Sequence, residues 1–359
     1  MHEVMSGSRR GVSATLLRGG LSLAEPFYAG AVTLRNRFYD HRASHSATLP
    51  RPVISIGNIT TGGTGKTPMV RWLADRLRQE GHHVAVLSRG YGSAPGSLGD
   101  EQVMLERLLN TDHETPVVLA ANPSRVLAAR QVLAAHPEID VFVLDDGFQH
   151  RAVARDLDIV LISATSPFGY GHVLPRGMLR EPLRGLRRAG AVVVTHADRV
   201  DMAQLQQIEN QLRNAGSTAP IHHAKHAAAG FRKAAIPSSA PPDISQTGIQ
   251  SSKIFAFCAI GNPAAFFENL KQLGGQLVAT ESFRDHHFYT SGDLTLLRDR
   301  AKAAGADVLV TTEKDWAKIV ALEGAADDTL PILRMDVQIE FFDSDEQRLL
   351  EQVRAAINR

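Results

Sequence analysis

A glycine-rich segment that ends in a lysine and a threonine is the part of this sequence with the clearest chemical use. It reads Gly57-Asn58-Ile59-Thr60-Thr61-Gly62-Gly63-Thr64-Gly65-Lys66-Thr67 and stands between an apolar run and a helical pattern. Glycines let backbone N–H groups turn towards phosphate oxygens, the lysine reaches the β- and γ-phosphates, and the threonine hydroxyl can bind Mg²⁺. The segment predicts a phosphate-binding loop, and the alternative is a glycine-rich turn without a ligand. We expect ATP to be bound by Thr60, Thr61, Gly62, Gly63, Thr64, Gly65, Lys66 and Thr67.

Two adjacent carboxylates, Asp145 and Asp146, follow the apolar run Val141-Phe142-Val143-Leu144. An apolar strand that ends in aspartates is typical of the Walker B element, which holds Mg²⁺ beside a phosphate-binding loop. Taken alone, the pair could equally be a solvated turn. With the loop upstream it predicts a Mg²⁺ site made by Thr67, Asp145 and Asp146, in which either aspartate contacts the ion directly or through water.

Arginines are concentrated in one short stretch of a chain that has almost no net charge. Between Pro175 and Gly190 there are five arginines and one glutamate, Glu181. Guanidinium groups suit phosphate because they offer paired N–H donors. We expect Arg180 to be functional because prolines frame it in a loop, whereas the arginines that follow it could form an ordinary solvated basic face.

Side chains that could transfer a proton stand late in the chain, at Asp285-His286-His287. A histidine beside a carboxylate can accept the proton of a hydroxyl nucleophile. A zinc site is the competing interpretation, but no cysteine or second histidine cluster stands at ligand spacing.

These residues must be positioned by an α/β fold. Short apolar runs alternate with helical patterns from Arg51 onward, which indicates a mostly parallel sheet with helices on both faces, of the P-loop NTPase type. The expected strands are Val53–Ile56, His83–Ser88, Val117–Ala120, Val141–Leu144, Ile159–Ile162 and Ala191–Thr195, and the expected helices include Lys66–Glu80 and Ser124–Ala135.

The alternation restarts after a segment rich in Pro, Ser and Gln at residues 236–252. The expected second set of elements is Ile254–Ala259, Ala264–Leu273, Gln276–Thr280, Leu294–Ala304, Val308–Thr311 and a final helix from Ser344. We therefore predict a P-loop kinase domain at residues 46–216 and a smaller C-terminal α/β domain at 217–359, which could pack back on the first.

An amphipathic helix is expected within residues 1–45, beginning near Pro26. Phe27, Ala31, Leu34 and Phe38 fall on one stripe, and arginines lie around it. Such a helix can rest at a membrane surface with its apolar stripe among acyl chains, and the alternative is a helix packed on the core.

Composition restricts the function classes. Lys plus Arg (39) minus Asp plus Glu (38) leaves a net charge of +1, which gives no basic field for nucleic acid. With 359 residues and a single cysteine, Cys258, the chain suits two domains in a reducing compartment. No apolar run reaches the roughly 18 to 20 residues that a membrane-spanning helix needs. No obligate protein partner is inferred.

Seven motifs in one order resemble those of the tetraacyldisaccharide 4'-kinase family, the lipid A kinases of the Gram-negative lipopolysaccharide pathway. They are Ile56-Gly57-Asn58 with Gly62 to Pro68, Ser88-Arg89-Gly90-Tyr91-Gly92, Gly99-Asp100-Glu101, Asp145-Asp146-Gly147-Phe148-Gln149-His150-Arg151, Pro175 to Glu181, Asp285-His286-His287, and Thr312-Glu313-Lys314-Asp315. A Gly-Lys-Thr loop alone would be unspecific, whereas this ordered set is not.

The resemblance implies transfer of the ATP γ-phosphate to the 4'-hydroxyl of a tetraacylated glucosamine disaccharide 1-phosphate, giving lipid IVA. It implies that Asp100 with His286 accepts the hydroxyl proton, that Lys66 and Mg²⁺ stabilise charge, and that Arg180 with Glu181 lies at the reacting phosphates or the sugar. It also implies a peripheral enzyme at the cytoplasmic face of the bacterial inner membrane, attached by the N-terminal helix. The alternative function is a P-loop regulatory ATPase that acts as a nucleotide-dependent switch.

Overall fold

The structure is a computed structural model, and it describes residues 2–41, 46–90, 102, 105–106, 109–110, 115–233, 249–261, 263–284, 287–320, 322–325 and 329–359. The chain forms two compact units. The first comprises Met1–Ser97, Val117–Lys225 and Ile339–Arg359, and the second comprises Leu98–Pro116 and His226–Gln338. This division differs from the expected domains at 46–216 and 217–359, because the chain returns to the first unit near its C-terminal end.

The first unit contains a parallel sheet in the strand order β3-β2-β4-β1-β5-β6-β7. Its strands are β1 (Val53–Asn58), β2 (Val84–Ser88), β3 (Val118–Ala121), β4 (Val141–Asp145), β5 (Leu157–Ser163), β6 (Ala191–Thr195) and the first part of β7 (Ile221–Lys233). The expected strands are confirmed to within two residues at each end. Ile56 of β1 pairs with Asp145 of β4, so both strands end at the same edge of the sheet. The phosphate loop and the two aspartates therefore emerge side by side.

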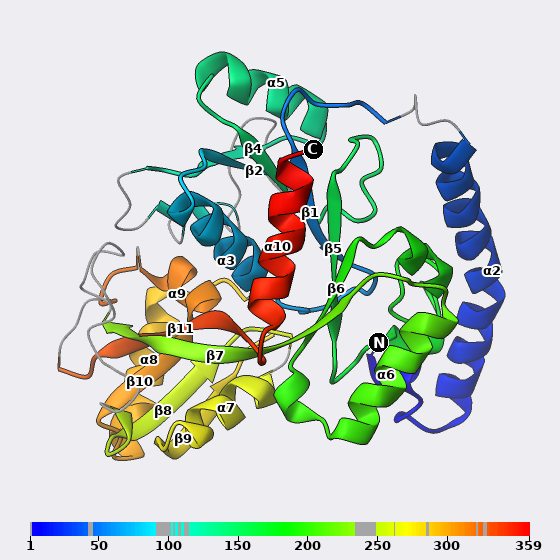
Figure 1. The fold of residues 1–359 in the computed structure, drawn as a ribbon. Coiled ribbons are helices and arrows are strands. Elements are labelled where there is room, and N and C mark those ends of the chain that lie inside the picture. Colours follow the sequence, from blue (N-terminus) through cyan, green and yellow to red (C-terminus); the bar gives the residue numbers. More distant parts are fainter. Residues whose placement is uncertain are drawn as a thin grey trace. The chain divides into compact units, whose positions relative to one another are not determined.

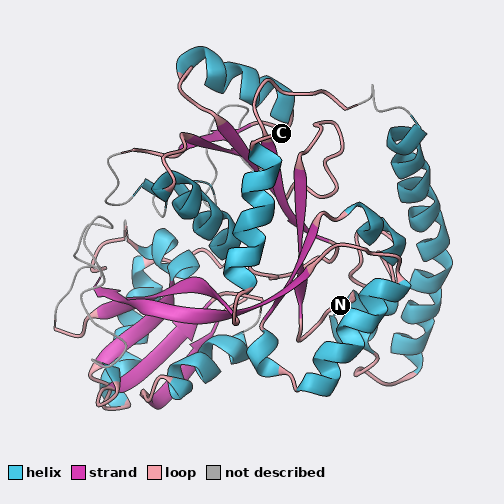
Figure 2. Ribbon diagram, in the orientation of Figure 1, coloured by secondary structure: helices cyan, strands magenta, loops and turns pink. Residues whose placement is uncertain are grey.

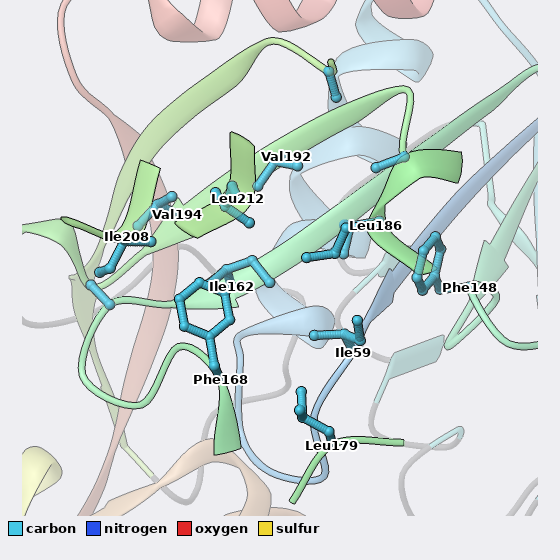
Figure 3. Packing of buried hydrophobic residues seen from close by; sticks show 14 of the residues in the cluster. Ile59, Phe148, Ile162, Phe168, Leu179, Leu186, Val192, Val194, Ile208 and Leu212 are labelled. Atoms are coloured by element: carbon cyan, nitrogen blue, oxygen red, sulfur yellow. The ribbon is translucent and has the colours of Figure 1, made fainter. Parts of the chain in front are cut away.

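Helices cover both faces of this sheet (Figures 1 and 2). On one face, Ile208 and Leu212 of α6 (Met202–Asn214) join a core cluster with Val192 and Val194 of β6, which Figure 3 shows at close range. On the same face, α5 (Arg125–Ala135) packs on β2 and β3. Successive side chains of β1 point to opposite faces of the sheet, and both sets are buried. Helices α3 (Lys66–Gln79) and α10 (Asp345–Ile357) contact this strand. The predicted α/β class is confirmed.

The N-terminal helix is longer than expected. After the short α1 (His2–Ser6), α2 runs from Val12 to His41 with Pro26 inside it, so the expected start at Pro26 is wrong. Proline removes one helical N–H donor, but its partner would be the carbonyl of Ser22, an exposed residue that water can reach. Within the described part of the chain, no helix is long and apolar enough to cross a membrane.

The two sides of α2 differ in what they contact. Val32 is buried, and Tyr28 and Ala29 pack against the cluster that contains Ile59 and Phe148. The stripe predicted from the sequence points the other way, since the side chains of Phe27, Leu34 and Phe38 are 81%, 71% and 55% exposed.

The second unit is a smaller α/β structure, as predicted. Its strands lie in the order β11-β10-β8-β9, and β8 pairs in parallel with both β9 and β10. The elements are the end of β7, β8 (Lys253–Cys258), α7 (Pro263–Gln272), β9 (Gln276–Ser282), α8 (Ser291–Ala303), β10 (Val308–Thr312), α9 (Glu313–Ile319) and the first part of β11 (Ile332–Phe341). Phe255, Phe257 and Trp316 form part of its core. Most of the expected linker at 236–252 lies outside the described residues.

Among its described residues, the first unit also contains three short 3₁₀ helices. They are η2 (Gly169–Gly171), η3 (Leu183–Arg188) and η4 (Ala197–Arg199). The first two flank the segment that carries Arg180 and Glu181.

Candidate functional site

The predicted phosphate loop lies between the end of β1 and the start of α3. Gly65 is the residue before the helix and has φ 86°, in the left-handed region that favours glycine. Inside the loop, Asn58 Nδ2 donates to Thr64 Oγ1 at 2.9 Å, and Thr195 Oγ1 donates to the carbonyl of Thr64 at 3.0 Å. The Thr64 side chain is thus used to hold the loop, while Lys66 and Thr67 start the helix. A helix N-terminus at this point offers N–H groups and partial positive charge to an anion.

The first part of the loop is paired with the segment that carries Arg180. The backbone N–H of Thr61 donates to the carbonyl of Met178 at 2.7 Å, and that of Arg180 donates to the carbonyl of Ile59 at 2.8 Å. Thr60 forms an antiparallel bridge with Leu179. Thr60 and Thr61 therefore fix the position of the Arg180 segment, which leaves Gly62 to Thr67 as the part of the loop best placed to meet phosphate.

Asp146 is the residue on which the positive groups converge. Its carboxylate accepts from Arg180 Nη1 at 2.8 and 2.7 Å, and Lys66 Nζ lies 3.7 Å from Oδ1. Burial opposes ionisation, but the charges of Lys66 and Arg180 outweigh it and hold the pKa of Asp146 below its ordinary value. The structure thus brings two of the sequence-predicted site residues, Lys66 and Arg180, into contact with the ionised carboxylate of a third, Asp146.

Asp146 owes its position to a backbone turn after β4. Its φ of 51° lies in the left-handed region, which an aspartate adopts more readily than most residues. The turn packs closely on β1, because a Cβ added to Gly57 would lie only 2.6 Å from Cβ of Phe148. Because of this close approach, only a residue without a Cβ fits at position 57, opposite Phe148 of the Asp-Asp-Gly-Phe motif.

The backbone of Asp145, the last residue of β4, accepts a hydrogen bond from a buried arginine. Arg125 is only 1% exposed, and its Nη2 donates to the carbonyl of Asp145 at 3.2 Å. Sequence reasoning missed Arg125. One feature of the sequence could have indicated this arginine. It directly follows Ser124, which caps α5 at the edge of the sheet where the site lies.

Glu181 is fully buried and its carboxylate is shared among three neighbours. It accepts from Arg188 Nη2 at 3.0 and 2.9 Å, from Gln149 Nε2 at 3.0 Å and from Asn36 Nδ2 at 2.8 Å. These contacts favour a role in holding the Arg180 segment over direct contact with the reacting groups. Asn36 and Gln149 were not predicted as functional residues, although Gln149 stands in one of the motifs.

Two further arginines of this stretch, Arg184 and Arg188, contact other parts of the first unit. Arg188 also lies over the ring of Phe148, with 4.6 Å between the guanidinium carbon and the ring centroid. Arg184 Nη2 donates to Thr33 Oγ1 of α2 at 2.7 Å. The alternative of a solvated basic face is therefore wrong for Arg188, whereas Arg184 and Arg187 are exposed.

The predicted proton-accepting pair, Asp100 and His286, lies outside the described residues, as does Asp285. Its neighbour His287 is described: its ring stacks on Phe283 and its Nε2 lies 3.4 Å from Asp293 Oδ2. The role of Asp100 and His286 stays a prediction.

Two histidines near the site make the stability of the protein depend on pH. Burial, reinforced by positive neighbours such as Arg125, lowers the pKa of His150 to about 4, and burial together with Arg199 lowers that of His196 to about 4. The unfolded chain, in which histidine titrates near 6.5, binds more protons than the folded chain between these values. The free energy of unfolding should therefore fall as the pH falls from about 6.5 to about 4.

The substitution His150→Gln tests this effect. We expect it to reduce the loss of stability between pH 7 and pH 5 by about 1 kcal/mol, after allowance for solvent screening. Urea unfolding of both proteins at the two pH values gives the free energies of unfolding, with His136→Gln, at a partly exposed histidine, as control. An unchanged difference between the two pH values in His150→Gln would contradict the assignment.

Comparison with known proteins places the chain in one family. The sequence model of the family described as tetraacyldisaccharide-1-P 4'-kinase (LpxK) matches residues 18–358. The tetraacyldisaccharide 4'-kinase of Anaeromyxobacter sp. (strain K) is 38% identical over 348 residues, which are 92% of this chain and 89% of that protein. That of Chlorobaculum tepidum is 38% identical over 320 residues, which are 86% and 87% of the two chains.

A solved structure agrees with these relatives. The crystal structure of LpxK from Aquifex aeolicus in complex with ATP has a TM-score of 0.73 and 26% identity, and the match covers 95% of this chain and 99% of that one. The resemblance drawn from the motifs is confirmed, and a regulatory ATPase is not favoured. The chain belongs to the tetraacyldisaccharide-1-P 4'-kinase family.

Proposed function

We propose that the protein transfers the γ-phosphoryl group of ATP to the 4'-hydroxyl of a tetraacylated glucosamine disaccharide 1-phosphate, forming lipid IVA in lipid A biosynthesis. The observation that carries this proposal is the convergence of Lys66 and Arg180 on Asp146 beside the phosphate loop. Phosphoryl transfer needs little covalent chemistry from the protein, and positioning and charge stabilisation supply most of the catalysis. Membership of a kinase family supports the same reaction.

Lys66 and Arg180 have the geometry to stabilise the transferred group. Both are cationic, and both lie within 4 Å of the same carboxylate beside the phosphate loop. The backbone N–H groups at the start of α3 add donors for phosphate oxygens. In this proposal Lys66 and Arg180 exchange part of their contact with Asp146 for contact with the β- and γ-phosphates.

Thr67 and Asp146 fit a Mg²⁺ ion, with Asp145 as the alternative carboxylate. A hydroxyl and an ionised carboxylate are hard oxygen ligands, and Mg²⁺ in kinases takes one or two protein carboxylates together with phosphate oxygens and water. The lowered pKa of Asp146 keeps the carboxylate ionised, as binding requires. When bound, the ion would neutralise charge on the phosphates.

Asp100, paired with His286, is proposed to orient the acceptor hydroxyl and take its proton. A carboxylate supported by an imidazole can do this at neutral pH if it lies within hydrogen-bond reach of the hydroxyl. The support for this proposal is the match of both residues to the family motifs.

An acceptor assay tests the proposed function. The protein is incubated in detergent with γ-labelled ATP, Mg²⁺ and acylated disaccharide monophosphate, and labelled lipid is separated from free phosphate. We expect a labelled lipid that disappears when EDTA removes the metal. ATP hydrolysis without labelled lipid would instead indicate the regulatory ATPase.

The N-terminal helix is proposed to attach the enzyme to the cytoplasmic face of the inner membrane. Large apolar side chains, Leu16, Leu23, Phe27, Leu34 and Phe38, are all more than half exposed along α2. An apolar stripe on a helix with arginines beside it suits an interface with anionic lipid headgroups. The proposed acceptor carries four acyl chains, so an enzyme held at the membrane surface can reach it there.

Three substitutions on this stripe test the attachment. The triple change Phe27→Ser, Leu34→Ser and Phe38→Ser should lower the fraction bound to anionic lipid vesicles at least about tenfold, since each large apolar side chain contributes roughly 1.5–3 kcal/mol when fully buried. Vesicle sedimentation measures the effect. Leu127→Ser, at an exposed apolar residue of α5, should bind like the wild type. Equal binding by the triple variant would remove the stripe as the attachment surface.

A further inference from the structure

The side of α2 opposite the apolar stripe holds the segment that carries Arg180 and Glu181. Glu25 Oε1 accepts from the backbone N–H of Val173 at 2.9 Å, and Tyr28 Oη donates to the carbonyl of Arg180 at 3.1 Å. Asn36 Nδ2 donates to Glu181 Oε2 at 2.8 Å. With 3.6 residues per turn, positions 25, 28 and 36 fall on one side of the helix, and positions 27, 34 and 38 fall on the other.

Of these three contacts, the one made by Asn36 reaches the site through buried groups. Its amide donates to Glu181, which is completely buried. Gln149 Nε2 donates to the same carboxylate at 3.0 Å, and Gln149 Oε1 accepts from Arg180 Nη1 at 3.3 Å. A buried carboxylate depends on all its donors, because each one removed leaves a lone pair without compensation.

We propose that Asn36 is a positioning residue for phosphoryl transfer, which acts through Glu181 and Gln149 on the guanidinium of Arg180. The inference rests on the proposed function and adds to it a second task for α2. One side of the helix meets lipid, and the other side fixes the group that meets phosphate. Without the Asn36 amide, Glu181 keeps Arg188 and Gln149 but loses one of the two donors to its Oε2. The carboxylate, and with it Gln149 and the Arg180 guanidinium, is then held less firmly in one position.

Substitution at position 36 separates this role from simple attachment. Asn36→Leu removes the amide at similar size, and Asn36→Asp places a carboxylate against Glu181. We expect kcat in detergent micelles to fall about tenfold for leucine and further for aspartate, corresponding to a loss of roughly 1.4 kcal/mol or more of transition-state stabilisation. The KM for ATP should change less than kcat, because the loop from Gly62 to Thr67 still binds the phosphates when Arg180 is displaced. Vesicle binding should stay as in the wild type.

A milder variant keeps the test decisive if both changes at position 36 impair folding. Asn36→Ala removes the same amide without adding a larger apolar group, and we expect it to lower kcat about tenfold with unchanged vesicle binding. Asn214→Leu, the leucine replacement at an exposed position of α6, is the matched control and should behave as the wild type. Thermal unfolding of each variant shows whether it is folded.

Three results would overturn the inference or its basis. Wild-type kcat in folded Asn36→Leu, or in Asn36→Ala when the former does not fold, excludes a positioning role. Reduced vesicle binding, with kcat restored in detergent, would mean that Asn36 serves attachment alone. An inactive wild type in the lipid assay would refute the proposed function itself, which is distinguishable from the first two results because in those the wild type is active.

Discussion

Replacing Asp146 by asparagine lowers kcat of phosphoryl transfer at least about a hundredfold, which is the expected cost of removing the charged centre of the site. Asparagine keeps the size of the side chain but not its charge. Lys66 and Arg180 then lose the carboxylate that both contact, and the proposed Mg²⁺ site loses a ligand. Steady-state kinetics with saturating ATP and acceptor gives kcat, and a titration of Mg²⁺ gives its apparent affinity.

The comparison with Asp145→Asn decides which aspartate meets the metal. If Asp146 is the direct ligand, its substitution should raise the Mg²⁺ concentration needed for half-maximal activity more than substitution of Asp145 does. Asp299→Asn, at an exposed position of α8, controls for removal of one negative charge. Near-normal kcat in Asp146→Asn would show that the ionised group at the meeting point of Lys66 and Arg180 is not part of the reaction.

Replacing Asp100 by alanine should lower kcat about a thousandfold while the dissociation constant of ATP changes less than about threefold. The physical reason is a division of tasks. ATP is proposed to be held by the loop from Gly62 to Thr67, whereas Asp100 is proposed to act only on the acceptor hydroxyl, so its loss affects the chemical step. Kinetics and equilibrium binding of a non-hydrolysable ATP analogue measure the two quantities separately.

The partner variant His286→Ala sharpens the test of this pair. Its kcat should fall less than that of Asp100→Ala, and the double variant should be little worse than Asp100→Ala alone, because groups that act as a unit are not additive. Loss of ATP binding in Asp100→Ala would assign this residue to the nucleotide instead. Independent effects in the double variant would separate the two residues into different tasks.

The sheet and the phosphate loop were predictable because their signals are local. A buried parallel strand is a short apolar run, and β1 is buried along all six residues, so Val53–Ile56 was sufficient to find it. The loop was predictable because glycines and a lysine must stand at fixed spacing to bind phosphate. Strand β7 was missed, since Ile221–Lys233 is rich in alanine and histidine and its strand structure comes from pairing with β6.

Residues that act through contacts distant in sequence could not be predicted. Asn36 and Glu181 are 145 positions apart, and nothing near Asn36 in the sequence indicates a buried carboxylate as its partner. The buried Arg125 illustrates the same limit, because an arginine in a helix is usually solvated and only the fold places it under β4. Pro26 misled the prediction of α2 for a different reason, since an exposed proline costs less inside a helix than its usual effect suggests.

The route of the chain through its two units has a consequence for biosynthesis. Helix α10 contacts β1 and β5 of the first unit, and its Glu346 accepts a hydrogen bond from Trp72 of α3 at 3.0 Å. The ribosome makes β1 and α3 early and α10 only after the whole of His226–Gln338. The inserted second unit can therefore fold on the ribosome before α10 is made, and the first unit gains its contacts with α10 only after that.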